Sequence, residues 1–219
     1  MIPAFARPFI VIGCHRSGTS WLAAAMHRSG IHMGVNRDHN EEAIHFLSLN
    51  QQAIQMAGGH WDNPILPQEN HWPNHQPYAL LKIHFDLHRR RDFVWQIILG
   101  KTAWGWKDPR NTFTLPHWLT LYPEAKIIHL VRNADDVVKS LINRQNTPGE
   151  VRSQVQEDRD KAHALWKKYV EQARSYQPKL KDRYLEINYE SLLLAETHHK
   201  LNAFCKKDVG KALMELRKT

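Results

Sequence analysis

A short apolar run near the start of the chain leads directly into a loop bounded by glycines. The run is Phe9–Ile12, the loop is Gly13–Gly18, and a helix-like segment extends from Gly18 to Arg28. Glycines allow a tight turn, and backbone N–H groups at the positive end of a helix attract anions. The feature therefore predicts a buried strand, a phosphate-binding loop and a helix. A plain strand-to-helix connection is the alternative.

The alternation of strand-like and helix-like segments continues along the chain. Further strands are expected at residues 103–107, 126–131 and 184–187, and helices at 41–57, 85–99, 134–144, 150–176 and from Ser191 onward. Strands separated by helices predict an α/β fold with a central, mainly parallel sheet flanked by helices. With 219 residues the chain has room for one domain, which we expect to span residues 1–219.

The loop Gly13–Gly18 has the glycine spacing of a Walker A loop but lacks its lysine. Thr19 stands where that lysine is expected, and the basic residue of the loop comes earlier, at Arg16. A kinase needs the lysine on the terminal phosphates together with Mg²⁺. A P-loop small-molecule or nucleoside kinase is therefore kept only as an alternative enzyme.

A second apolar strand also ends in a basic residue, and a helix follows it. Arg132 ends the strand, Asn133 is expected to cap the helix, and Ser140 lies two turns further on. The Arg132 guanidinium and the Ser140 hydroxyl are expected to converge on one phosphate. In the alternative, Arg132 pairs with Asp135 or Asp136 and Ser140 faces solvent.

Together the two motifs resemble the sulfotransferase family, which uses 3′-phosphoadenosine 5′-phosphosulfate (PAPS) as donor. Arg16–Leu22 resembles the family's 5′-phosphosulfate loop, and Ile127–Ser140 resembles its 3′-phosphate motif, with Asn133-Ala134 in place of the usual Asp-Pro. Tyr189–Leu192 resembles a Tyr-Glu-Ser-Leu element whose tyrosine lies near the adenine, although an ordinary helix start is the alternative. The resemblance implies a three-layer fold like that of P-loop NTPases.

The resemblance also implies roles for individual residues. Arg16 would neutralise the bridging oxygen of the leaving group, Arg132 would hold the 3′-phosphate with Ser140, and Tyr189 would lie beside the adenine. The residues expected to hold the 5′-phosphate are Ser17, Gly18, Thr19 and Ser20, with Trp21 next to them mainly for packing. An acceptor oxygen or nitrogen would attack sulfur in line, without a metal.

Further catalytic groups are expected after the strand at 103–107. The segment Lys107–Arg110, Lys-Asp-Pro-Arg, resembles an element of bacterial sulfotransferases. Lys107 would also offset charge on the leaving oxygen, and Asp108 is a candidate catalytic residue. A salt-bridged strand end, with little effect on stability, is the alternative.

The general base has four candidates. Glu41 and Glu42 begin the helix expected at 41–57, and their placement resembles relatives that use a glutamate there. As an alternative, glutamates in a first helical turn simply stabilise the helix through their interaction with its dipole. His84 and Asp108 compete with them, and Glu42 is preferred slightly.

The net charge of +8 favours an anionic ligand without distinguishing a nucleotide from a polyanion. A non-catalytic basic module, binding polyanions through Arg89-Arg90-Arg91 and the lysine-rich end, is the alternative of another class. Such charge runs are more often solvated, and no signature of a specific nucleic-acid partner is present. The tail 204–219 does not match the glycine- and lysine-rich segment that closes over the donor in cytosolic relatives. Either Arg89–Arg91 or Arg152 would take over the closing of the donor site, or the affinity for the donor is weak.

The remaining sequence features limit which cofactors and which cellular location are expected. Among 15 histidines no His-Glu-x-x-His pair occurs, and the adjacent His198-His199 should point to different sides of a helix, so no metal is expected. Cys14 and Cys205 cannot form a disulfide framework. Without a signal-like or membrane-spanning segment, a cytoplasmic protein is expected. The sequence does not identify the acceptor, and carbohydrates are among the candidates. The stretch Trp61–Trp72 would suit an acceptor pocket, and a packed surface loop is the alternative.

Overall fold

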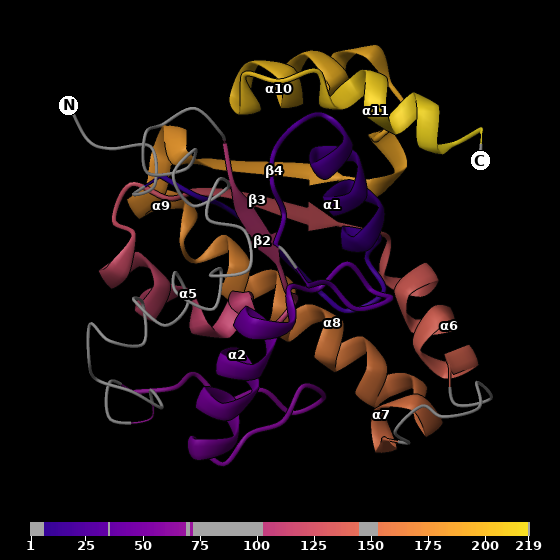
Figure 1. Ribbon diagram of the computed structural model, residues 1–219. Helices are drawn as coiled ribbons and strands as arrows, with labels where there is room; N and C mark the ends of the chain where they lie inside the picture. Colours follow the sequence, from indigo (N-terminus) through magenta and orange to yellow (C-terminus); the bar gives the residue numbers. More distant parts are fainter. Residues whose placement is uncertain (1–6, 35, 69–70, 72–102, 145–152, 219) are drawn as a thin grey trace.

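The structure is a computed structural model that describes residues 7–34, 36–68, 71, 103–144 and 153–218 (Figure 1). Within these ranges its centre is a four-stranded parallel sheet with the strand order β2-β1-β3-β4. The strands are β1 (Phe9–Gly13), β2 (Gly105–Lys107), β3 (Lys126–Val131) and β4 (Tyr184–Asn188). Each strand predicted from the sequence is present, and the α/β fold class is confirmed.

One face of the sheet packs against α2 (Ile44–Met56), α5 (Asn111–Leu121) and α8 (Arg159–Arg174). Ile10 and Ile12 of β1 point to this face and are fully buried there. Figure 1 shows the three helices below the sheet. Because successive strand residues point to opposite faces, a second helical layer is needed to cover the residues between them.

The opposite face carries α1 (Thr19–Arg28), α10 (Ala195–Cys205) and α11 (Val209–Leu216). Val11 and Leu130 point to it and are inaccessible to solvent. Figure 1 shows α10 and α11 as a layer above the sheet. The continuous apolar runs of β1 and β3 are thus explained by burial on both faces.

Helix α6 (Ala134–Arg144) extends the structure sideways from the end of β3. Its buried residues Val137, Val138 and Leu141 pack against α8. Asn133 Oδ1 accepts the backbone N–H of Asp135 at 2.9 Å. The predicted helix cap is therefore confirmed.

The helix expected from residue 41 begins later, at Ile44, and the prediction of its start was wrong. Glu41 has a φ of 62° and forms an ion pair with Arg37. The backbone N–H of Glu42 donates to Asp38 Oδ1 at 2.8 Å. Glu41 and Glu42 thus belong to a tight turn before α2 rather than to its first helical turn.

The single helix expected over 150–176 is interrupted, so this prediction also needs correction. In the described part, α7 (Gln154–Glu157) ends before Asp158, and α8 begins at Arg159. Asp158 Oδ1 accepts the N–H groups of Asp160 and Lys161 at 2.9 and 3.1 Å. An aspartate that caps a new helix has an extended backbone, which breaks the old one.

Helix α5 was not predicted. All of its first five residues, Asn111 to Leu115, are buried, and Pro116 lies in its interior. Three of these five buried residues, Asn111, Thr112 and Thr114, are polar, so burial along the helix does not follow an apolar stripe that hydrophobic periodicity could reveal. The other short elements are helix α9 (Gln177–Leu180) and two 3₁₀ turns, Lys181–Arg183 and Tyr189–Ser191.

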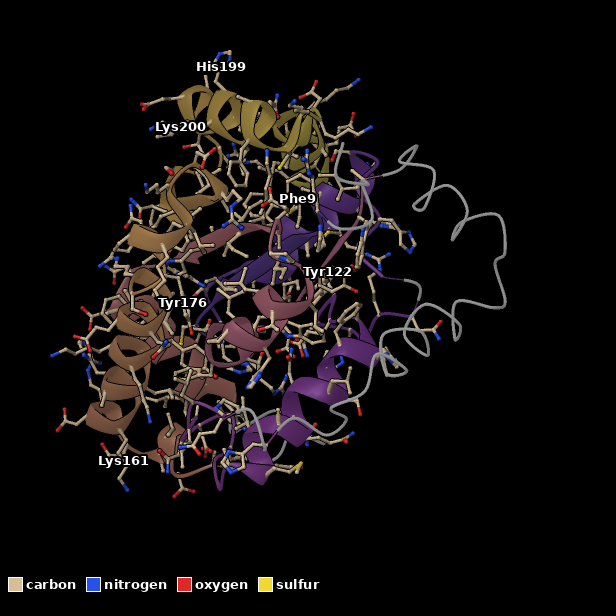
Figure 2. The ribbon with its side chains drawn as sticks, turned by 90° about the vertical axis from the view of Figure 1, so that its left-hand side faces the viewer. Phe9, Tyr122, Lys161, Tyr176, His199 and Lys200 are labelled. Atoms are coloured by element: carbon tan, nitrogen blue, oxygen red, sulfur yellow. The ribbon has the colours of Figure 1, made fainter. Side chains whose placement is uncertain are left out.

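Helix α10 presents its two adjacent histidines differently. His198 Nε2 donates to the Leu192 carbonyl at 2.9 Å, whereas His199 projects from the outer surface (Figure 2). They point to different sides, as predicted. Among the described residues, no group of three or more His, Cys, Asp or Glu side chains is placed to hold a metal ion.

Some predictions fall outside the described residues: the helix at 85–99 with Arg89–Arg91, the base candidate His84, and Arg152. In the part of the chain that the structure covers, no helix is both long enough and apolar enough to cross a membrane.

Candidate active site

Three neighbouring strands end at one cleft. Since β2, β1 and β3 are adjacent and parallel, their carboxyl ends lie along the same edge of the sheet, where ligands bind in such folds. Lys107 ends β2, the loop containing Arg16 follows β1, and Arg132 follows β3. All three residues line a cleft of about 470 Å³. Sheet topology alone therefore brings together residues from distant parts of the chain.

The loop after β1 has the backbone that an anion-binding turn requires. Arg16 and Gly18 have φ values of 69° and 85°. A Cβ at Gly18 would lie 2.3 Å from Tyr189 Cε2, so only glycine fits there. Gly18 is the N-cap of α1, whose first turn contains no acidic residue. The cleft wall at this helix end is formed by Gly18, Thr19, Ser20 and Trp21.

Two buried polar atoms at this end of the cleft have no hydrogen-bond partner within the described residues. They are Ser17 Oγ and Arg132 Nε. Ser17 is 1% exposed, and buried hydroxyls almost always have a partner. Arg132 lines the cleft, so a ligand with anionic oxygens would supply an acceptor there, whereas Ser17 lies behind the wall residues Arg16 and Gly18.

The second basic position lies beside the first. The Arg132 guanidinium stacks 4.6 Å from the centre of the Tyr189 ring, and its NH1 donates to the Arg16 carbonyl at 3.3 Å. Arg16 Nε in turn donates to Ser140 Oγ at 2.9 Å. Asp135, an alternative partner of Arg132, pairs with Arg159 at 2.6 Å instead. Arg16, Arg132 and Ser140 therefore form one group.

The end of β3 is held in place from two sides. Trp166 Nε1 on α8 donates to the Arg132 carbonyl at 3.0 Å. The backbone N–H of Asn133 donates to Glu190 Oε1 at 2.8 Å. These bonds fix the main chain from which the Arg132 side chain extends into the cleft.

Lys107 belongs to a buried ion network at the other side of the loop. Its Nζ lies 3.1 Å from Glu42 Oε1, and Arg110 NH1 lies 3.2 Å from Glu42 Oε2. Arg110 NH1 also lies 2.9 Å from Asp108 Oδ1. Lys107 is 1% exposed and Glu42 5%. Two cations and two carboxylates thus offset one another, which buried charges require.

Asp108 lies behind the cleft rather than in its wall. It is fully buried, and its Oδ2 accepts the Asn50 amide at 2.9 Å. Its Oδ1 accepts both the backbone N–H and the NH1 of Arg110 at 2.9 Å. Asp108 therefore orients Arg110.

Of the base candidates within the described residues, Glu42 is the one in the cleft wall. Burial raises the pKa of Glu42, the Asp108 charge adds to the increase, and Lys107 and Arg110 oppose it. Glu42 therefore accepts a proton at a higher pH than an exposed glutamate would. Glu41, paired with Arg37, is not part of the wall.

Sequence reasoning missed part of the cleft wall. The Lys-Asp-Pro-Arg segment does not by itself assign a role to Arg110. Only its short distance along the chain from Lys107 indicates that it belongs to the site. Asn40, Gln51 and His60 also line the cleft, and nothing in their sequence context marks them. Trp61, within the stretch expected to suit an acceptor, is in the wall. Trp72 lies outside the described residues.

The fold and the cleft define a parallel α/β protein with a P-loop-like turn and three cationic side chains, Lys107, Arg16 and Arg132, at or just after the ends of neighbouring strands. A sequence profile of the sulfotransferase family matches residues 8–206. The chain therefore belongs to the sulfotransferase family, and this membership supports sulfotransferase activity. Comparison with curated protein sequences found no match.

Solved bacterial sulfotransferases share the fold. The sulfotransferase domain from the curacin biosynthetic pathway is 15% identical, with a TM-score of 0.54 over 94% of this chain and 74% of that one. A sulfotransferase from Alicyclobacillus acidocaldarius is 16% identical, with a TM-score of 0.54 over 95% and 83%. Sulfotransferase STF1 from Mycobacterium tuberculosis H37Rv is 17% identical, with a TM-score of 0.52 over 95% and 70%.

The contact between Gly18 and Tyr189 yields a prediction about stability. Gly18→Ala adds backbone strain and a collision with the Tyr189 ring, whereas Gly58→Ala adds strain alone, because Gly58 has a φ of 80° and no atom within 4 Å of its Cβ position. We expect Gly18→Ala to lower the free energy of unfolding by about 1–3 kcal/mol more than Gly58→Ala. Urea unfolding measures both, and equal losses would contradict the packing described here.

Proposed function

We propose that the protein transfers a sulfuryl group from PAPS to a hydroxyl or amine of an acceptor, in line and without a metal. The observation that supports this most is that Arg16 and Arg132 line one cleft, with Ser140 bonded to Arg16. A nucleotide with phosphates on both its 5′ and 3′ oxygens needs two such cationic positions. ATP carries all its phosphates in one chain on the 5′ oxygen and has no 3′-phosphate for the second position.

The side chains around the loop fit this donor. The first turn of α1 suits the 5′-phosphate, since a helix N-terminus favours negative charge. The Ser17 hydroxyl, which has no hydrogen-bond partner among the described residues, would join it. Arg132 and Ser140 suit the 3′-phosphate. Tyr189 contacts Arg132 and lies 6.1 Å, centre to centre, from the Trp21 ring, which lines the cleft. These two rings suit the adenine.

Arg16 and Lys107 suit the charge that develops during transfer. A bond forms between the acceptor oxygen and sulfur while the bond from sulfur to the phosphate oxygen breaks, and adenosine 3′,5′-bisphosphate leaves. Negative charge grows on that phosphate oxygen, and cations already fixed beside it lower the barrier without reorganising. Both side chains line the cleft, Arg16 from the loop after β1 and Lys107 from the end of β2.

Glu42 is proposed as the general base and Asp108 as a positioning residue. The acceptor proton would pass to a Glu42 carboxylate oxygen as the new bond forms. Lys107 and Arg110 hold both oxygens of that carboxylate, so its orientation is fixed before a substrate binds. Asp108 acts through Arg110, which it holds from behind.

The role of Arg132 can be tested with two nucleotides. Arg132→Ala should weaken adenosine 3′,5′-bisphosphate about 10- to 100-fold, because a charge-assisted pair is lost. Adenosine 5′-monophosphate, which lacks the 3′-phosphate, should bind the variant and the unaltered protein alike. Titration calorimetry measures both affinities.

Arg159→Ala is the matched control, because Arg159 is an exposed arginine that pairs with Asp135. It should change neither affinity by more than about twofold. Equal weakening of the two nucleotides by Arg132→Ala would show that Arg132 does not hold the 3′-phosphate.

The role of Glu42 can be tested by pH dependence. The base acts deprotonated, so kcat/KM should fall as the pH drops through its raised pKa, above the value of about 4.3 for an exposed glutamate. Glu42→Gln should lower kcat/KM about 100- to 10,000-fold and abolish this limb of the profile, with the bisphosphate Kd nearly unchanged. Transfer from labelled donor is the assay. If Glu41→Gln causes the loss and Glu42→Gln does not, the assignment is wrong.

A further inference from the structure

The cleft extends beyond the residues proposed to hold the donor. Its far wall is built by the turn before α2, by α2 itself and by a turn at residues 60–63. Asn40, Gln51, His60 and Trp61 contribute to this wall, next to Glu42. None of the four belongs to the segments that resemble the family's nucleotide motifs. We call them the acceptor wall.

Trp61 is fixed before any ligand binds. His60 and Asn63 exchange two backbone hydrogen bonds, at 3.1 and 3.2 Å, which close the turn that carries Trp61. The Tyr169 hydroxyl on α8 donates to the Trp61 carbonyl at 2.9 Å. The Trp61 ring meets the buried His15 ring edge-on, with the centres 5.0 Å apart. The hydrogen bonds fix the backbone of Trp61 and the His15 ring contacts its indole, so the side chain loses less freedom on binding a ligand than one on a mobile turn would.

The polar members of the wall are held in a similar way. Asp62 Oδ1 lies 2.7 Å from His60 Nδ1, and Asp62 also accepts the Ser153 hydroxyl. Asn40 is held at its backbone, where its N–H donates to Asp38 Oδ1 at 2.9 Å. His60 and Asn40 are therefore positioned groups, whereas Gln51 is an exposed side chain on α2.

The chemistry of the wall matches a particular class of acceptor. The half-buried Trp61 offers an apolar surface, and the amides of Asn40 and Gln51 both donate and accept hydrogen bonds. A sugar ring has an apolar C–H face that packs on an indole and hydroxyls that pair with amides and imidazole. A phenol or an alkyl alcohol would cover the same polar groups and leave them unpaired, which costs affinity.

We propose that the acceptor wall binds a carbohydrate, with Trp61 as the platform under the sugar ring. The proposal rests on the proposed sulfuryl transfer only for the fate of the bound sugar. Glu42 and Trp61 line the same cleft, and Arg110, which holds Glu42 Oε2, lines a smaller hollow together with Trp61 and His60. A hydroxyl of a ring seated on Trp61 would therefore face the side of the cleft that carries the proposed base. Trp61 would be a specificity-determining residue, since it has no role toward the donor.

The test uses the full chain and a defined panel of acceptors: cellobiose, maltose and a chondroitin disaccharide, with 4-nitrophenol and 1-octanol as competitors of other classes. Transfer of label from ³⁵S-labelled PAPS gives kcat and KM for each. Saturation-transfer NMR, with and without adenosine 3′,5′-bisphosphate, gives sugar binding independently of turnover. At least one sugar should exceed both competitors in kcat/KM by about 10-fold or more.

Two variants separate the platform from mere packing. Trp61→Ala should raise the KM for the sugar about 10-fold or more, whereas Trp61→Phe should raise it less, and the bisphosphate Kd should stay within about twofold in both. Phe204→Ala is the matched control, because Phe204 is also a half-buried aromatic and packs against Phe9 on the α10 side of the sheet (Figure 2). It should leave the sugar KM unchanged.

The outcomes separate this inference from the proposed function. If the bisphosphate fails to bind while the sugar binds through Trp61, the proposed function fails and the acceptor wall stands. If the bisphosphate binds but no sugar is bound or labelled, or the phenol or alcohol is preferred, the carbohydrate inference is overturned. Equal effects of Trp61→Ala and Phe204→Ala on the sugar KM would also overturn it.

Discussion

The parallel order of β2, β1 and β3 is the constraint on which the site depends. Parallel neighbours end at the same edge, so Lys107, the loop with Arg16, and Arg132 must lie side by side once the sheet forms. The apolar runs that drive strand burial on both faces therefore also assemble the cleft. Packing and function share one cause here, and the surrounding helices mainly hold the strand ends in place.

The cleft concentrates features that stability alone would not favour. Arg16 has a left-handed backbone, Ser17 and Arg132 carry buried atoms without partners among the described residues, and Glu42 is buried with Lys107 and Arg110. Strained backbone and buried ion pairs cost free energy that an apolar replacement would avoid. Their gathering at one edge of the sheet is what a preorganised site for an anionic substrate requires.

Local signals explain which features the sequence could predict. The strands β1 and β3 are apolar runs, and the motifs at Arg16 and Arg132 follow directly from them, so fold class and family were predictable. Helix α5 was not, because its buried first turn is largely polar and gives no apolar stripe. The setting of Glu42 depends on Lys107, far along the chain, and the acceptor wall joins three segments that no local pattern connects. Tertiary contacts alone define both.

The central claim is that the two basic positions hold opposite ends of one nucleotide. A crystal structure with adenosine 3′,5′-bisphosphate tests it most directly. We expect the 5′-phosphate at Ser17 and the first turn of α1, and the 3′-phosphate on Arg132 and Ser140, with the bond from Arg16 to Ser140 replaced by bonds to the ligand. A ligand held by one phosphate only, with the other in solvent and Arg16 still bonded to Ser140, would contradict the account.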